Sequence, residues 1–519
     1  MTQPPAPEDA ATRIAAGYAT AGPSLVLGSV VHDGQPHPDS QVRVPLAMLN
    51  RHGLIAGATG TGKTKTLQLL AEQLSAAGVP VVVADVKGDL SGLSAPGTGG
   101  DRVTQRAANT ADDWAASAFP TEFLSLGGIG PGVPVRATMT QFGPTLLAKV
   151  LDLNATQESS LGLVFHYADG AGLPLLDLKD LRSVISWLVS DEGKPELKAL
   201  GGLSASTAGV LLRELIGLQE LGGDVFFGEP EWEPTDLMRV GADGRGVISA
   251  VELAAVQDRP ALFSTFLMWL LAELFEELPE VGDVDKPKLV FFFDEAHLLF
   301  SGASKAFLES VTQTVRLIRS KGVGIFFVTQ NPTDVPSAIL GQLGNRVQHA
   351  LRTFTPEDAT ALRKTVSTFP KSKDYDIAEM LTSLGIGEAA VTVLSDRGTP
   401  TPVAWTMLRS PRSLMGPVEP AVLQQAVAGS PLQAKYGQPV DRESAYERLA
   451  ARLAPPAPPP VAEERPEEPE RRPEPEPEQD NVVEKVLGSA AFKSFARSAA
   501  SSLGREITRG LFGTRRRRR

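Results

Sequence analysis

"GATGTGKTKT" (residues 57–66) follows the apolar run "GLIA" and precedes the helix-forming run "LQLLAEQL". It matches the pattern G-x-x-x-x-G-K-[ST], and a strand before it and a helix after it are the context that this pattern requires. The glycines let successive backbone N–H groups face an anion, and the positive end of the following helix points to the same place. The stretch therefore predicts a phosphate-binding loop in an α/β domain.

The loop also predicts the cofactors. Lys63 is expected to reach the outer phosphates, and the hydroxyl of Thr64 is expected to bind Mg²⁺. A glycine-rich turn without a ligand is the alternative, but such a turn does not require a Lys-Thr pair at this spacing. ATP and Mg²⁺ are the expected cofactors, and the predicted ATP-binding residues are Gly57, Ala58, Thr59, Gly60, Thr61, Gly62, Lys63, Thr64 and Lys65.

A second apolar strand, "LVFFFDEAH" (289–297), ends in two acids. A buried strand of this kind carries Asp294 to the edge of the sheet, where its carboxylate can hold Mg²⁺, while Glu295 can orient or deprotonate the attacking water. Two acids that only begin the next helix are the alternative, because acids are common at helix N-termini. His297 is expected to pack or hydrogen-bond beside these acids rather than to catalyse.

Other polar residues follow strands that should end at the same edge. Gln330, in "GIFFVTQNP", is placed to sense the terminal phosphate or to position water, although a polar turn before Pro332 would look the same. Asp85 and Lys87, in "ADVKGD", face the same edge or form a solvated turn.

Arginines near the end of a predicted helix suggest a further catalytic group. Arg316 and Arg319 lie three residues apart on one helix face, where either favourable interaction with the helix C-terminus or an arginine finger explains them. The finger would stabilise charge on the transferring phosphate across a subunit interface. Arg346 and Arg352, in "GNRVQHALR", are further candidates.

Composition limits the class of protein. The chain has 519 residues, of which 42% are hydrophobic and 21% charged, as in ordinary globular proteins. It contains no cysteine, which excludes disulfides and thiol catalysis and fits a reducing compartment. Its first residues lack the basic and apolar regions of a signal peptide. We therefore expect a cytoplasmic protein.

The order of apolar patterns predicts a doubly wound parallel sheet interrupted by helices. Strand and helix patterns alternate up to the strand "VPVVVADV", give way to helical patterns, and resume at "GVISAVELA" before a closing hairpin. "SLVLGSVV" (24–31) and "VRVPLAML" (42–49) are expected to be two strands before the phosphate loop. The predicted divisions are a disordered leader (1–22), a β element with the first part of the ATPase core (23–137), a helical insertion (138–238), the second part of the core (239–415), a helical extension (416–453), a disordered Pro/Glu linker (454–481) and a basic tail (482–519).

The basic tail stands out from an acidic chain. The net charge is −11, yet residues 482–519 carry ten Lys or Arg against two Glu. Apolar residues recur there at mostly helical spacing, which predicts a basic amphipathic helix. Such a helix could dock on the core or a neighbouring subunit, bind DNA phosphates, or lie on an anionic membrane surface.

Longer phrases resemble a known family. "GATGTGKT", "DVKGDLSGL", "FFFDEAHLLF", "RLIRSKGVGIFFVTQNPTDVP", "LGQLGNRVQHALR" and "LGIGEAAVTVLSDRG" resemble the bacterial HerA-like helicase-domain ATPases, within the wider group of HerA- and FtsK-type motors. The resemblance runs from about residue 24 to about 415 and returns in "REITRGLFG". It implies a RecA-like core, dependence on ATP and Mg²⁺, and a hexameric ring with its sites between subunits.

These observations predict an ATP hydrolase, an oligomeric motor that acts on nucleic acid, with DNA as the expected polymer. Two alternatives stay open from the residues. One is a phosphotransferase in which Glu295 activates an acceptor hydroxyl, and the other is a scaffold protein whose assembly is switched by ATP.

Overall fold

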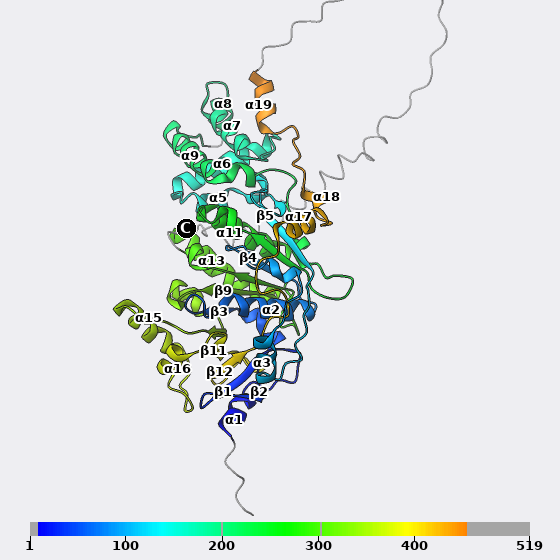
Figure 1. Cartoon of the computed structure of the whole chain (residues 1–519). Helices are drawn as coiled ribbons and strands as arrows, with labels where there is room; N and C mark the ends of the chain where they lie inside the picture. Colours follow the sequence, from blue (N-terminus) through cyan, green and yellow to red (C-terminus); the bar gives the residue numbers. More distant parts are fainter. Residues whose placement is uncertain (1–8, 199–200, 301–303, 454–519) are drawn as a thin grey trace, which may run out of the picture.

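The computed structural model describes residues 9–453, except 199–200 and 301–303. Within these ranges, a sheet of twelve strands runs through the molecule with helices on both faces (Figure 1), in the order β2-β1-β12-β11-β10-β3-β9-β8-β4-β7-β5-β6. The strands are β1 (Ser24–His32), β2 (Gln35–Pro45), β3 (Gly53–Ala56), β4 (Val81–Asp85), β5 (Thr121–Leu126), β6 (Val133–Val135), β7 (Ile248–Glu252), β8 (Leu289–Phe293), β9 (Val323–Thr329), β10 (Asn345–Gln348), β11 (Glu388–Thr392) and β12 (Ala404–Leu408).

The sheet has a parallel and an antiparallel part. Neighbouring strands from β10 to β6 in this order are parallel. Neighbouring strands from β2 to β10 are antiparallel. The predicted parallel sheet is therefore present, but the strands before the phosphate loop and the closing hairpin extend it at one edge. The fold is mixed α/β with a large, mostly parallel sheet.

Helices cover both faces of the parallel part. α2 packs Leu67, Leu70 and Leu74 into the core on one face, whereas α11 and α13 belong to the core on the other. The longer helices are α2 (Lys63–Ala76), α3 (Asp101–Asn109), α6 (Ala155–Gly170), α7 (Leu178–Val189), α9 (Ala205–Leu218), α11 (Pro260–Glu277), α13 (Lys305–Ile318), α15 (Pro356–Val366), α17 (Pro420–Ala428) and α19 (Ala445–Leu453). The shorter ones are α1 (Ala10–Ala16), α4 (Met139–Phe142), α5 (Pro144–Val150), α8 (Lys194–Lys198), α10 (Asp224–Phe226), α12 (His297–Phe300), α14 (Ser337–Leu340), α16 (Ile377–Ser383) and α18 (Gln433–Tyr436).

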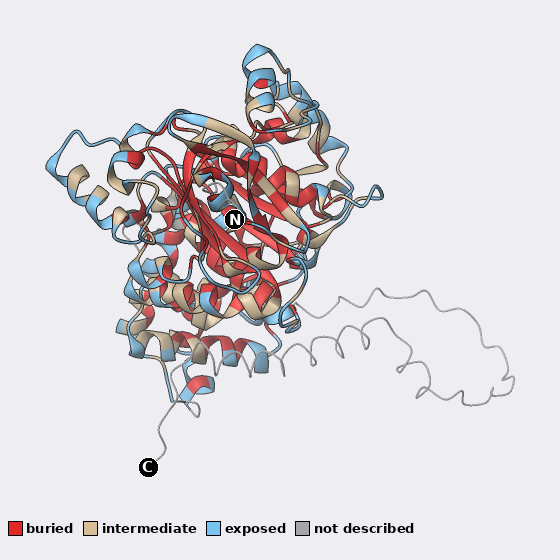
Figure 2. Cartoon of the chain, turned by 90° about the horizontal axis from the view of Figure 1, so that it is seen from below, coloured by how far each residue is buried: buried red, intermediate tan, exposed pale blue. Residues whose placement is uncertain are grey.

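Burial on both faces explains the apolar runs in the sequence. Phe291 and Phe293 of β8 face one core, and Val290 and Phe292 face the other. A strand covered on both sides reads as continuous apolar sequence rather than as an alternating pattern. The buried colour in Figure 2 accordingly follows the strands in the middle of the molecule.

Helices α4 to α10 lie between β6 and β7 in the chain. In Figure 1, α6 to α9 lie at the upper end of the molecule, with α19 beside them. Their apolar residues, such as Leu181 and Leu211, join the same core cluster as Phe266 of α11. Helices α17 to α19 follow β12. The predicted domain boundaries in this part of the chain remain a prediction.

Two local expectations differ from the structure. The leader was expected to be disordered over residues 1–22, but Ala10–Ala16 form helix α1. Ile14 and Tyr18 are buried, and the Tyr18 hydroxyl lies within hydrogen-bond distance of the carbonyls of Val391 (2.7 Å) and Pro402 (2.5 Å). The strand expected at 42–49 ends at Pro45, and a 3₁₀ helix spans Leu46–Arg51.

The predicted linker (454–481) and basic tail (482–519) lie outside the described residues. Among the residues that the structure describes, no helix combines the length and apolar character needed to cross a bilayer.

Candidate nucleotide-binding site

The phosphate loop begins between the ends of two strands. The N–H of Gly57 donates to the carbonyl of Thr329, at the end of β9, over 3.2 Å. The N–H of Ala58 donates to the carbonyl of Ala350, just beyond β10, over 2.8 Å. The loop then closes on itself, because the Thr61 hydroxyl donates to the carbonyl of Ala58 over 2.7 Å. It therefore lies at the C-terminal edge of the parallel strands, as the sequence predicts.

The loop's backbone requires glycine. Gly57, Gly60 and Gly62 have φ angles of 152°, 78° and 118°, which side chains of L residues rarely adopt. A Cβ atom at Gly57 would lie 2.5 Å from the Cβ of His349. His349 is fully buried beneath the loop, and its Nε2 lies 2.8 Å from the Thr66 hydroxyl on α2. Burial lowers the pKa of His349 to about 4, so the ring is neutral.

Lys63 lies inside the loop. Its ammonium donates to the carbonyls of Gly57 (2.7 Å) and Ala58 (3.2 Å), and the side chain is buried. Burial lowers the pKa of Lys63, whereas the charges of Glu295 and Asp294 oppose that shift. The structure therefore brings the loop lysine within electrostatic range of the two acids that end β8.

The two residues after Lys63 diverge. Thr64 is half-buried in the first turn of α2. Lys65 instead donates to Oε1 of Gln68 over 3.3 Å on the same helix, so the structure does not turn its ammonium into the loop. The exposed loop residues are Thr59 and Gly60.

Asp294 is a buried carboxylate at the end of β8 with 1% of its surface exposed. Its Oδ1 accepts a hydrogen bond from the N–H of Glu295 over 2.9 Å, while Oδ2 has no hydrogen-bond partner among the described residues. Burial raises the pKa of Asp294 to about 7, and the charge of Glu295 adds to the shift. A buried oxygen without a partner beside a phosphate loop fits a cation ligand.

Glu295 is held by two basic side chains. Lys87 forms an ion pair with Oε1, and Nδ1 of His297 lies 3.2 Å from Oε2. Burial raises the pKa of Glu295, but the hydrogen bond and charge of Lys87 outweigh burial and leave this pKa below its ordinary value. The backbone φ of Glu295 is 47°, an uncommon angle for a residue other than glycine. Such strain concentrates at functional sites.

Asp85 explains how Lys87 is positioned. Its carboxylate, fully buried at the end of β4, accepts hydrogen bonds from the N–H groups of Lys87 (3.1 Å), Gly88 (2.7 Å) and Leu90 (2.8 Å). Asp85 therefore fixes the turn, and Lys87 alone of the pair reaches the acids of β8. The sequence left open whether Asp85 and Lys87 face the site or form a solvated turn. In the structure, Asp85 holds a turn whose Lys87 side chain faces the site.

Gln330 lies at the same edge. It is exposed and follows Thr329, whose carbonyl accepts from Gly57. The Thr329 hydroxyl itself donates to Oδ2 of Asp334 over 2.7 Å. Gln330 is thus beside the loop, as expected.

The arginine candidates separate into two groups. Arg316 is exposed and Arg319 lies 3.8 Å from Asp283; both precede β9, whose other end meets the phosphate loop. A seven-residue strand is roughly 20 Å long. Arg316 and Arg319 therefore lie far from the phosphate loop of their own chain, so the expected arginine finger could act only on another subunit's site, and this role stays a prediction.

The other two candidates lie at β10: Arg346 is within this strand and Arg352 follows it. Arg346 donates to the carbonyl of Thr368 over 3.2 Å, which indicates a structural role. Arg352 is exposed and lies two residues beyond Ala350, at the edge that holds the loop.

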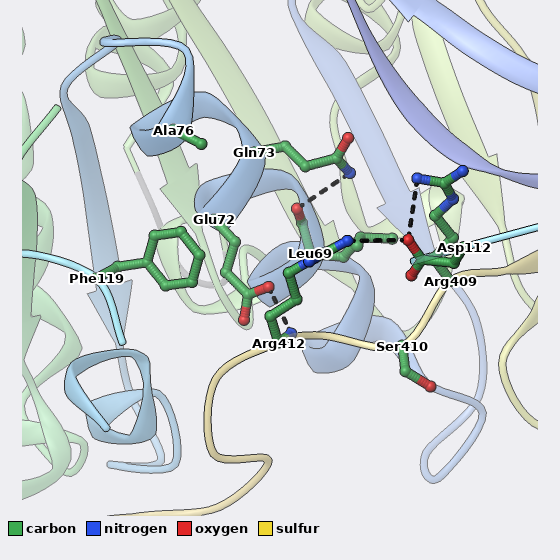
Figure 3. A pocket seen from close by; sticks show the side chains of 9 residues that line it. All are labelled: Leu69, Glu72, Gln73, Ala76, Asp112, Phe119, Arg409, Ser410 and Arg412. Carbon is green, nitrogen blue, oxygen red and sulfur yellow. Dashed lines mark hydrogen bonds and ion pairs between the residues drawn. The ribbon is translucent and has the colours of Figure 1, made fainter. Parts of the chain in front are cut away.

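A separate pocket lies beside the middle and C-terminal half of α2 (Figure 3). Its acids are already paired. Glu72 accepts from the backbone N–H groups of Arg412 (2.8 Å) and Ser413 (2.9 Å), and Asp112 lies 3.2 Å from Arg409 and 3.1 Å from Arg412. These contacts bind the segment after β12 to α2 through Glu72 and to the segment after α3 through Asp112, so the pocket is a structural junction rather than the nucleotide site.

One family model matches most of the chain, and several solved structures resemble it more distantly. The family described as "Helicase HerA-like C-terminal" matches residues 31–519. A search of curated proteins gave no match. Among solved structures, the bacterial conjugative coupling protein TrwBdeltaN70 is 15% identical, with a TM-score of 0.49 over 78% of this chain and 93% of that one. VirB4 of Thermoanaerobacter pseudethanolicus is 16% identical, with a TM-score of 0.47 over 76% of this chain and 98% of that one. Because this family match covers residues 31–519, most of the chain, the chain belongs to the HerA-like ATPase family.

Proposed function

We propose that this chain is a Mg²⁺-dependent ATP hydrolase with a RecA-like core, acting as one subunit of a hexameric ring motor that moves on DNA. The observation that carries the hydrolase is the grouping of Lys63, inside the phosphate loop, with Asp294 and Glu295 at the end of β8. Membership of the HerA-like family supports the ring and the motor. The absence of cysteine supports a cytoplasmic location.

The residues present fit ATP and Mg²⁺. The loop's backbone N–H groups and the start of α2 would hold the phosphates, and Lys63 would exchange its loop carbonyls for phosphate oxygens. Thr64 and the unpartnered oxygen of Asp294 would hold Mg²⁺. The ion would neutralise charge on the phosphates.

Glu295 would orient the attacking water and accept its proton. For this its carboxylate must be ionised, and the pair with Lys87 keeps it so. Gln330, exposed at the same edge, would contact the terminal phosphate or the water.

Two substitutions test the hydrolase. Lys63→Ala should weaken ATP binding, because the charge that holds the outer phosphates is lost. Glu295→Gln should bind ATP normally and lose turnover, because only the group that acts on water has changed. Binding by calorimetry and phosphate release by a coupled assay check both, with Glu309→Gln, at an exposed position of α13, as the matched control. Equal turnover in the wild type and Glu295→Gln would reject the assignment.

Added polymers test the motor. Duplex DNA should stimulate phosphate release. Labelled γ-phosphate that appears on another molecule would instead indicate a phosphotransferase, and tight ATP binding with almost no turnover would indicate an ATP-switched scaffold.

The basic tail is proposed to contribute to assembly and to add a salt-sensitive DNA contact. An anionic membrane surface is the other partner that its positive charges could bind. Deleting residues 482–519 removes ten positive charges, so the dependence of DNA affinity on salt should become shallower. Unchanged oligomer mass together with an unchanged salt slope would reject this role, and loss of vesicle binding would indicate the membrane.

A further inference from the structure

A tight turn between α16 and β11 lies next to the phosphate loop. In this 385–388 turn, the N–H of Glu388 donates to the carbonyl of Gly385 over 3.1 Å, and Gly387 has a φ of 74°. The Glu388 carboxylate accepts from the N–H of Gly385 and from the Trp405 indole, both over 2.9 Å. The turn therefore has a defined shape that does not depend on a ligand.

The 385–388 turn is bonded directly to the loop. The N–H of Gly387 donates to the carbonyl of Thr61 over 2.9 Å. A Cβ atom at Gly62 would lie only 3.3 Å from the backbone N and Cα of Gly387. The two backbones are thus in contact where the loop enters α2.

Arg106 of α3 fixes the turn from behind. Its guanidinium donates to the carbonyls of Gly387 (3.0 Å), Ile386 (3.0 Å) and Leu408 (3.3 Å). These bonds engage the carbonyls of Ile386 and Gly387, and Ile386 is the exposed side chain of the turn.

Ile386 is 73% exposed, whereas Leu384 and Ala389 on either side of the turn are buried. A single exposed apolar residue is ordinary. This one differs because the turn that carries it is anchored to α3, to β12 and to the phosphate loop. A fixed apolar side chain beside an anion site is suited to a ligand that is charged at one end and apolar at the other.

Strand order gives the direction in which such a ligand would lie. β3, which leads into the loop, has β9 and then β8 on one side, and β10 and then β11 on the other. Asp294 and Glu295 follow β8, so the terminal phosphate belongs on that side. The opposite end of a nucleoside triphosphate then extends toward β10 and β11, where the 385–388 turn lies.

We propose that the 385–388 turn binds the nucleobase, with Ile386 packing against the face of the ring. This inference rests on the proposed function, since it assumes that the loop binds a nucleoside triphosphate. The contact is apolar and uses no hydrogen bond to the edge of the base. Because only a ligand with a base can make it, the contact increases the affinity for a nucleotide and not for phosphates alone.

Calorimetric titration of the full chain with ATP and with inorganic tripolyphosphate, both with Mg²⁺, tests the proposal. Ile386→Ala should raise the Kd for ATP by roughly fivefold, because a few methyl and methylene contacts are lost. It should leave the Kd for tripolyphosphate unchanged, because that ligand has no base. Ile386→Leu should restore the wild-type affinity for ATP. Ile216→Ala, which alters an exposed isoleucine on α9, is the matched control and should change neither Kd.

The outcomes separate this inference from the proposed function. A wild-type chain that binds neither ligand would reject the nucleotide site as a whole. Normal wild-type binding with an unchanged ATP affinity in Ile386→Ala would reject the base contact alone. An equal loss of both ligands would show that the turn acts on the loop's shape, which also overturns the proposal. A change in oligomer mass without a change in ATP affinity would assign Ile386 to a subunit contact instead.

Discussion

The ammonium of Lys87 forms an ion pair with the carboxylate of Glu295, joining the turn after β4 to the end of β8. The two strands are parallel neighbours, paired from Val81 with Val290 onward, so their C-terminal ends meet at one edge. Lys87 is half-exposed and Glu295 is buried. The pair therefore keeps an acid ionised in a place where burial alone would favour its protonated form.

Lys87→Met should move the acid limb of the pH profile of kcat/KM for ATP to higher pH. Glu295 has a lowered pKa while it is paired, and the loss of Lys87 removes the largest interactions that oppose burial, leaving only the charges of His297 and Lys63 to oppose it. A base with a higher pKa becomes protonated at a higher pH, so activity should be lost earlier on acidification. Steady-state ATPase rates from about pH 5 to pH 9 measure this shift, because kcat/KM reports the free enzyme.

The matched control is Lys305→Met, which removes an exposed lysine 3.8 Å from Glu309 on α13. Its profile should overlay that of the wild type, since exposed pairs contribute little. If the acid limb of Lys87→Met also overlays the wild type, Lys87 does not govern the ionisation of Glu295.

The parts of the site that the sequence predicted are those encoded locally. The phosphate loop and the Asp294–Glu295 pair each lie within one short motif that follows an apolar strand, so spacing alone places them. The pair between Lys87 and Glu295 depends on which strands become neighbours, and that is set by contacts between distant segments. The sequence around Lys87 indicated only that this residue lies at the C-terminal edge of the sheet or in a solvated turn.

The way in which the antiparallel edge joins the parallel strands was not predicted, for a related reason. β10 spans only Asn345–Gln348, too short to show a period, yet it joins β3 to the closing hairpin. His349 and Arg106 were missed as well, because a buried histidine beneath a loop and an arginine bound to carbonyls leave no pattern in the sequence around them. The sequence predicted the closing hairpin and two strands before the phosphate loop, but not that these strands extend the parallel sheet at one edge.

Glu252→Gln should stabilise the protein above about pH 8 relative to the wild type. Glu252 ends β7 opposite Asp85, and its Oε1 is buried without a hydrogen-bond partner among the described residues. Burial raises the pKa of Glu252 from 4.5 to about 8, and Asp85 adds to the shift. The folded state therefore holds a proton that the unfolded chain releases between these values, so wild-type stability falls as the pH rises through this window.

Urea denaturation at about pH 5 and pH 9 measures the effect. The free energy of unfolding of the variant, relative to that of the wild type, should be roughly 2–4 kcal/mol higher at pH 9 than at pH 5. Glu309→Gln, an exposed residue on α13, should show no such gain. A pH-independent difference between Glu252→Gln and the wild type would mean that Glu252 is ionised in the folded protein.

Glu72→Ala should destabilise the protein by about 2–3 kcal/mol. The buried Glu72 carboxylate accepts from the N–H group of Arg412 (Figure 3). It also accepts from the N–H group and the hydroxyl of Ser413, and Ala leaves these donors unpaired. Glu72→Gln keeps one acceptor oxygen and should cost less. Thermal unfolding of the three proteins measures the order, and equal loss in Gln and Ala variants would contradict an origin in these hydrogen bonds.

Arg316 should complete the site of a neighbouring subunit. It is exposed, and it lies at the far end of β9 from its own phosphate loop, so it can reach transferring phosphate only across an interface. Arg316→Ala and Lys63→Ala should each lower the ATPase rate by on the order of a thousandfold when every subunit carries the change.

Co-expression of the two variants, with selection of mixed rings through two affinity tags, separates the arrangements. With random assembly about one interface in four combines an intact Lys63 with an intact Arg316 from its neighbour, so up to about a quarter of the wild-type rate should return. The same experiment with Arg352→Ala is the comparison, because Arg352 follows β10 at the edge of its own loop. If the finger acts on the site of its own chain, the ATPase rate does not recover, because no subunit of the mixed ring has both an intact Lys63 and an intact finger. Recovery with Arg352→Ala but not with Arg316→Ala would exchange the two assignments, and a wild-type rate in uniform Arg316→Ala rings would remove Arg316 from the site.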